Sequence, residues 1–159
     1  MRVSIGQDSH RFATAQNNKK LIMGGVLFDT APAFEANSDG DVVLHAITNA
    51  VSGITCRNIL GKVADDMCKA GITDSREYLK VALKDLEEKK FRPVHLSMTI
   101  ECVRPKISPK VEEMRESIAA LMGMTPDSIG ITATTGEGLT AFGQGLGVMV
   151  FCILTVEEV

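Results

Sequence analysis

Two histidines and one carboxylate are the residues of this chain with the clearest chemical potential. Asp8 and His10 are one residue apart near the start of the chain, and His45 follows later. One carboxylate and two imidazoles form a ligand set for Zn²⁺ that leaves a fourth position open, as catalytic zinc sites do. The alternative is that these are ordinary polar groups on a loop end and on a solvated helix face. The spacing favours the metal site.

Two elements must position these ligands. Residues 1–6 are typical of a strand, and a strand that continues through residue 10 places Asp8 and His10 on one face. His45 belongs to a predicted amphipathic helix that runs to about residue 54, with Ser38 and Asp39 as its expected caps. Opposite its apolar stripe lies a polar stripe made of Asp41, His45, Asn49 and Ser52. We therefore predict that the helix presents His45 toward the end of the strand.

The remaining pattern interleaves strands and helices. Short strands are expected at 21–23 and 26–28 around a glycine turn, and longer ones at 95–103, 129–135 and 147–156. Helices are expected over 74–90, stopped by Pro93, and over 108–122, whereas 30–40 and 55–72 are predicted to be irregular. His95 falls on the solvated side of its strand, so we predict no metal role for it.

The number of predicted helices is too small to cover both faces of a sheet of about five strands. Residues 148–154 are nevertheless apolar on both faces of their strand. We therefore predict a mixed α/β fold with helices on one face and a homo-oligomer joined through its sheets.

Composition limits the class of protein. The length of 159 residues predicts one domain, and the 45% hydrophobic and 23% charged content are those of a soluble globular chain. A net charge of -3 without a basic stripe argues against nucleic-acid and anionic-membrane partners. The longest apolar run, 148–156, is too short to span a bilayer, and no signal peptide is expected. The four cysteines are far apart, which favours a reducing cytoplasm over a disulfide framework.

Several separated motifs occur in order along the whole chain. They are Gly6–Phe12, Met23–Val26, Asn37–Asp41 continuing to Leu44–Ala46, Leu60–Lys62, Asp74–Glu77, Arg104–Lys106, and Ala133–Thr135 followed by Glu137. Together they resemble the 2-C-methyl-D-erythritol 2,4-cyclodiphosphate synthase family of the non-mevalonate isoprenoid route. The resemblance implies one domain over residues 1–159, a ferredoxin-like α/β subunit, a homotrimer with active sites between neighbours, and a cytoplasmic enzyme.

The resemblance also implies a reaction. The substrate would be 4-diphosphocytidyl-2-C-methyl-D-erythritol 2-phosphate, whose 2-phosphate attacks the β-phosphorus so that CMP leaves and a cyclic diphosphate forms. Such an enzyme is a cyclising phosphorus–oxygen lyase. Zinc would lie on Asp8, His10 and His45, with a substrate phosphate as the fourth ligand. Glu137 would hold Mg²⁺ or Mn²⁺, because hard cations prefer carboxylate and phosphate oxygens. Two dications can screen two phosphates that must approach each other.

Further roles follow from the same resemblance. Thr135 would stabilise the transition state, Asp41 would hold the erythritol hydroxyls, and residues 64–68 would form a flexible substrate segment. The stretch from Cys102 to Ser108, with Thr134, would form the cytidine diphosphate pocket. The full expected substrate-binding set is Asp8, Ser9, His10, Asn37, Ser38, Asp41, Gly61, Asp65, Asp66, Cys102, Arg104, Pro105, Lys106, Ser108, Thr134, Thr135 and Glu137.

Some positions depart from the family pattern. Asn37 takes the catalytic position of a phosphate-facing His and cannot carry charge. Ile59 replaces a ribose-binding Asp, although a shift of one residue would offer Asn58. Gln144 and Leu146 replace an Arg and a Glu at the trimer axis, which does not favour an isoprenoid diphosphate there. One alternative is therefore a trimeric metal-binding relative with weakened turnover.

The other alternative is a non-haem Fe(II) enzyme, since two histidines and a carboxylate also bind iron in oxygenases. That class expects a β-sandwich and the order H-x-D/E…H, whereas this chain has D-x-H…H.

Overall fold

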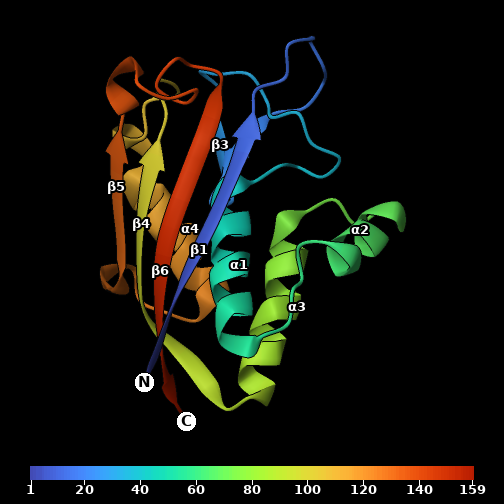
Figure 1. The fold of residues 1–159 in the computed structure, drawn as a ribbon, viewed down its shortest axis with the longest axis vertical. Helices are drawn as coiled ribbons and strands as arrows, with labels where there is room; N and C mark the ends of the chain where they lie inside the picture. Colours follow the sequence, from blue (N-terminus) through green and yellow to red (C-terminus); the bar gives the residue numbers. More distant parts are fainter.

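The main sheet of the protein is mixed and has four strands. In the computed structural model, which describes residues 1–159, its order is β1 (Arg2–Arg11), β6 (Gly147–Glu158), β4 (Phe91–Glu101) and β5 (Ile129–Thr134) (Figure 1). Strand β6 runs antiparallel to β1 and β4, whereas β4 and β5 are parallel. The carboxyl ends of β1, β4 and β5 therefore lie at the same end of the sheet, with β1 and β5 at opposite edges.

The connection order corrects the expected ferredoxin-like topology. A ferredoxin-like sheet runs β-α-β-β-α-β. Here α4 (Val111–Met122) lies between β4 and β5, and β6 follows β5, so the main elements run β-α-β-α-β-β. The difference arises because β4 and β5 are parallel neighbours, which need a crossover helix and cannot be joined by a hairpin.

Helices α1 (Val42–Thr55), α3 (Ser75–Glu88) and α4 all cover one face of the sheet, as predicted (Figure 1). Every second side chain of β6 is buried beneath them, namely Val148, Val150, Cys152, Leu154 and Val156. The intervening Phe151 and Ile153 are exposed on the uncovered face. Alternation along the strand therefore separates a core face from an open face that is itself apolar.

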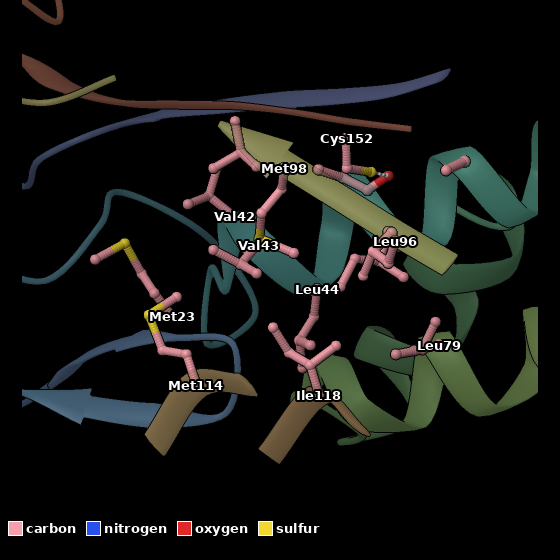
Figure 2. Packing of buried hydrophobic residues seen from close by; sticks show 14 of the residues in the cluster. Met23, Val42, Val43, Leu44, Leu79, Leu96, Met98, Met114, Ile118 and Cys152 are labelled. Carbon is pink, nitrogen blue, oxygen red and sulfur yellow. Dashed lines mark hydrogen bonds between the residues drawn. The ribbon is translucent and has the colours of Figure 1, made fainter. Parts of the chain in front are cut away.

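A single hydrophobic cluster of 36 buried residues fills the space between sheet and helices. Figure 2 shows Leu44 of α1 near Ile118 of α4, with Met98 and Cys152 of the sheet on the other side of α1. Helix α1 is thus covered both by the sheet and by other helices. For this reason Asp41, His45 and Ser52 are buried, which excludes the alternative of a solvated helix face for these residues.

The cap of α1 also differs from the prediction. Asp41 is the N-cap, and its carboxylate accepts a hydrogen bond from the Leu44 N–H at 3.0 Å. Its two oxygens also accept from Gly24 N–H at 2.8 Å and Gly25 N–H at 2.7 Å. Those glycines form the two-residue turn between β2 (Leu21–Met23) and β3 (Val26–Phe28), with φ of +63° and +75°. Asp41 therefore joins this hairpin to the start of α1.

Two further boundaries correct the sequence prediction. Part of the expected irregular stretch 55–72 is α2 (Lys62–Lys69), a short helix that buries only Ala64. Helix α3 ends at Glu88, and Pro93 lies inside β4 where the register with β6 shifts. Pro93 therefore does not stop the helix, because the strand has already begun by pairing Phe91 with Glu158.

Short 3₁₀ turns complete the chain as η1 (Ser108–Lys110), η2 (Pro126–Ser128) and η3 (Gly136–Gly138). His95 is exposed on β4, as expected. None of the helices combines the length and the apolar character that crossing a membrane requires.

Candidate functional site

The structure brings Asp8, His10 and His45 together. Asp8 Oδ2 lies 2.9 Å from His10 Nε2 and 3.1 Å from His45 Nδ1, and the two imidazole nitrogens are 3.1 Å apart. These three side chains form a group whose potential ligand atoms all lie within 4.8 Å of one another. The convergence predicted from spacing is confirmed, and the geometry fits a divalent metal.

A close approach between β1 and α1 makes this convergence possible. Gly6 has no side chain, and a Cβ placed there would lie 2.0 Å from the Ala46 carbonyl oxygen and 2.6 Å from the Ala50 nitrogen. Any larger residue would push α1 away from β1. Because Asp8 is the next residue on the same strand face, the close packing at Gly6 sets the distance that His45 must span.

The electrostatics of the cluster suit a cation. Burial raises the pKa of Asp8, but hydrogen bonds and charge interactions with His10 and His45 outweigh it and lower the pKa to about 2. Asp8 is therefore ionised at neutral pH, the form that binds metal. The side chains of Asp8, His10 and His45 remain 24%, 19% and 10% exposed, so one side of the cluster is open.

That open side faces a cavity of about 450 Å³. Its lining includes several residues of the expected substrate-binding set, namely Asp8, His10, Asn37, Ser38, Gly61 and Asp65. Helix α2 contributes Asp65 and Cys68, and the Cys68 thiol donates to the Asn37 carbonyl oxygen at 3.5 Å. The cavity therefore sits between the triad and the segment that the resemblance identifies as flexible.

Other expected residues lie outside this cavity. Asp41 is completely buried and its carboxylate is bonded to backbone donors, so the expected contact with substrate hydroxyls does not fit. Burial raises the pKa of Asp41 to about 6, against the lowering effect of those three donors. Ser9 is exposed on the face of β1 opposite Asp8, and Asp66 is exposed and paired with Lys62 at 2.6 Å. Ile59 is fully buried and cannot reach a ribose.

The remaining residues of the expected set lie beyond β4 and β5. Thr134 at the end of β5 and Thr135 and Glu137 just after it are exposed, and the Thr135 hydroxyl accepts from the Glu137 N–H at 3.4 Å. Glu137 has a φ of 53° and stands apart from the triad's group of ligands. In the loop after β4, Cys102 and Pro105 are buried, whereas Arg104, Lys106 and Ser108 are exposed.

One contact links this loop back to the first strand. The Arg104 guanidinium lies 5.2 Å from the centre of the Phe12 ring, just beyond β1. Thr134 and Glu137, in contrast, belong to the opposite edge of the sheet. One chain therefore gathers the metal ligands but leaves the expected second-metal ligand at the far edge.

Sequence reasoning missed two polar residues behind the triad. His45 Nε2 lies 2.8 Å from the Ser75 hydroxyl, and that hydroxyl donates to Asp39. Both residues were predicted only as part of helix starts. The signal available in the sequence was that Asp74, the residue before Ser75, could cap α3 by itself, as it does.

Solved structures share this fold. A 2C-methyl-D-erythritol-2,4-cyclodiphosphate synthase in its CDP-bound form superimposes with a TM-score of 0.86 and 27% identity, over 98% of this chain and 100% of that one. The bifunctional IspDF from Campylobacter jejuni gives a TM-score of 0.88 and 26% identity over 99% of this chain. This chain spans only 42% of that bifunctional protein.

Sequence comparison agrees. The 2-C-methyl-D-erythritol 2,4-cyclodiphosphate synthase of Chlamydia muridarum is 54% identical over 158 residues, which are 99% of this chain and 88% of that protein. The model of the YgbB family matches residues 1–157. With the fold, the triad and these matches in agreement, this chain belongs to the YgbB family.

Proposed function

We propose that this protein converts 4-diphosphocytidyl-2-C-methyl-D-erythritol 2-phosphate to 2-C-methyl-D-erythritol 2,4-cyclodiphosphate and CMP. In class it would be a phosphorus–oxygen lyase of isoprenoid biosynthesis. The observation that carries the proposal is the Asp8, His10 and His45 group at an open cavity, in a chain whose relatives bear that enzyme's name.

The triad would hold Zn²⁺, and Glu137 would hold Mg²⁺ or Mn²⁺. Bound there, the two cations would supply Lewis acidity that draws charge from the substrate phosphates. The chain's own residues would position the reacting groups. The Asn37 amide and the Ser38 hydroxyl line the cavity and can donate hydrogen bonds to a phosphate. Little covalent chemistry is asked of them, because phosphoryl transfer depends mainly on orientation and charge stabilisation.

The nucleotide would bind at the loop after β4. Backbone groups between Cys102 and Ser108 can pair with cytosine, while exposed Arg104 and Lys106 offer positive charge to the diphosphate. The CDP-bound relative supports a cytidine nucleotide as ligand. Thr134 and Thr135, exposed beside this loop, would donate to the phosphates, and Thr135 would stabilise the transition state.

The proposed assembly is a homotrimer joined through the open face of the sheet. Val3, Ile5, Phe151 and Ile153 are 62%, 63%, 39% and 49% exposed there. Ile5 pairs with Ile153 across β1 and β6, so the apolar residues form one continuous patch. Adjacent strands are about 4.8 Å apart, so β5 lies about 14 Å from β1 across the sheet. A second copy could bring its β5 edge to the first copy's triad and complete the site.

Phosphorus NMR tests the reaction. Protein loaded with Zn²⁺ and Mg²⁺ and incubated with the substrate should yield CMP and a cyclic diphosphate, whereas protein treated with a chelator should not. A metal-loaded, trimeric protein that forms neither product would support the weakened relative suggested by Asn37 and Ile59.

Metal analysis separates the second alternative, because a non-haem Fe(II) enzyme would be purified with stoichiometric iron. The helix-covered sheet is not the β-sandwich which that class expects.

All four cysteines are unpaired, which supports a proposed cytoplasmic location.

A further inference from the structure

A polar chain runs behind His45, on the side of the ring away from the cavity. His45 Nε2 lies 2.8 Å from Ser75 Oγ, and Ser75 Oγ is hydrogen bonded to Asp39 Oδ1. We propose that Ser75 and Asp39 are positioning residues that fix the His45 ring with Nδ1 toward the metal. This inference rests on the proposed zinc site and adds to it the groups that prepare one ligand.

The direction of the chain follows from what each group can donate. The Ser75 hydroxyl donates to the Asp39 carboxylate, whose oxygens also accept from two backbone N–H groups. The Ser75 oxygen is then available to accept from the His45 Nε2–H. The lone pair of the neutral ring is thereby assigned to Nδ1, which is the atom that faces Asp8 and His10. The chain selects one tautomer, the one that can bind a metal at Nδ1.

Asp39 is itself held from two directions. Its Oδ2 accepts from the Ser75 backbone N–H at 3.0 Å, and its Oδ1 accepts from the Asp41 backbone N–H at 3.0 Å. The carboxylate therefore joins the start of α3 to the start of α1. Because both helix starts converge on Asp39, the orientation of His45 is fixed by the packing of the two helices.

Burial makes the contact specific. Ser75 is completely buried, and His45 as a whole residue is 8% exposed. Solvent therefore cannot readily replace the Ser75 hydroxyl if it is removed. The cap of α3 is Asp74, whose carboxylate accepts from the Arg76 N–H. Ser75 is therefore not needed as the cap, and its hydroxyl is committed to His45 and Asp39.

The expected effect is on metal affinity. Partners of a ligating histidine usually change metal affinity by about 10- to 100-fold when they are removed. Ser75→Ala removes both bonds of the hydroxyl and should weaken Zn²⁺ binding by about that factor. Asp39→Asn keeps an acceptor for the Ser75 hydroxyl but removes the charge, and should cause a smaller loss.

Zn²⁺ alone, titrated in competition with a chromophoric chelator, provides the measurement. The matched control is Ser52→Ala, which removes a buried α1 hydroxyl that has no hydrogen-bond partner. The control should keep wild-type affinity, and melting of the metal-free proteins identifies variants that have lost the fold. Folded Ser75→Ala protein with wild-type affinity would overturn the proposal.

A second measurement needs no variant. Nitrogen-15 NMR of the histidines in Zn²⁺-loaded wild-type protein should show His45 protonated at Nε2 and metal-bound at Nδ1. Metal binding through Nε2, or no proton on it, would contradict the proposed chain even if Ser75→Ala failed to fold. Wild-type protein that binds zinc but makes no cyclic diphosphate would instead refute the proposed reaction and leave this inference standing.

Discussion

The triad at the β1 edge and the loop after β5 differ in one respect. A single chain brings all the triad side chains together, whereas the loop residues have few partners within the chain. Asp8, His10 and His45 lie on the covered face of the sheet. Strand β1 and helix α1 hold their potential ligand atoms within 4.8 Å of one another. Thr135 and Glu137 are exposed and are held by short turn contacts. If the proposed trimer forms, metal binding at the triad would be a property of the single chain, whereas the proposed catalysis would require a partner surface.

Removing a triad ligand should have the largest effect. His45→Ala and Asp8→Ala should each weaken Zn²⁺ binding by about a thousandfold, because zinc-binding free energies of about 10–16 kcal/mol are shared by few ligands. Calorimetric titration of metal-free protein measures this. His95→Ala is the control, since His95 is exposed on β4, and equal losses in all three variants would contradict the assignment.

A charge on the open face should separate assembly from metal binding. Ile153→Asp places a carboxylate in the apolar patch, where burial against another copy would be costly. Sedimentation should show smaller species. The value of kcat/KM should fall by about a hundredfold, because misplaced reacting groups lose about that factor in rate. Zinc binding should persist. Lys84→Asp, on exposed α3 surface, is the matched control, and an active monomer would refute the completed-site argument.

Glu137→Gln should affect turnover without affecting the triad. Loss of the carboxylate weakens the proposed Mg²⁺ site, so kcat should fall by about 30- to 100-fold and more Mg²⁺ should be needed. Zinc affinity should remain at the wild-type value because Glu137 is not part of the triad's group. A parallel loss of zinc would place Glu137 at the first metal and contradict this separation.

The smallest expected effect concerns the cavity itself. Asn37→His introduces the residue that the resemblance implies at this position, and a protonated imidazole can donate charge-assisted hydrogen bonds to phosphate. Initial rates should rise by about 3- to 10-fold near pH 6, and the gain should shrink above pH 7 as the imidazole loses its proton. Ser38 lines the same cavity as Asn37, so Ser38→Ala serves as the comparison variant. An unchanged rate at every pH would show that Asn37 does not limit turnover.

Much of the fold followed from local patterns. Alternation in β4, the apolar run of β6 and the two-glycine turn between β2 and β3 identified these elements, and the alternation also identified the covered face of β4. Local pattern failed where packing decided. Helix α2 has only eight residues and buries one of them, and β4 extends back through Pro93 because β6 pairs with it there. The ferredoxin-like topology that the resemblance implied was also wrong, and no local signal could correct it, since none states which strands are neighbours.

For the site, the sequence by itself determined which residues could bind a metal. Residue type decides which side chains can be ligands, and the periods of strand and helix indicate which of these side chains share a face. Only the tertiary structure decided how they are used. Gly6 lets α1 approach β1, Asp41 is committed to three backbone donors, and Ser75 and Asp39 meet behind His45. These contacts join segments distant along the chain, and their geometry depends on the packing of whole helices, which no spacing of residues encodes.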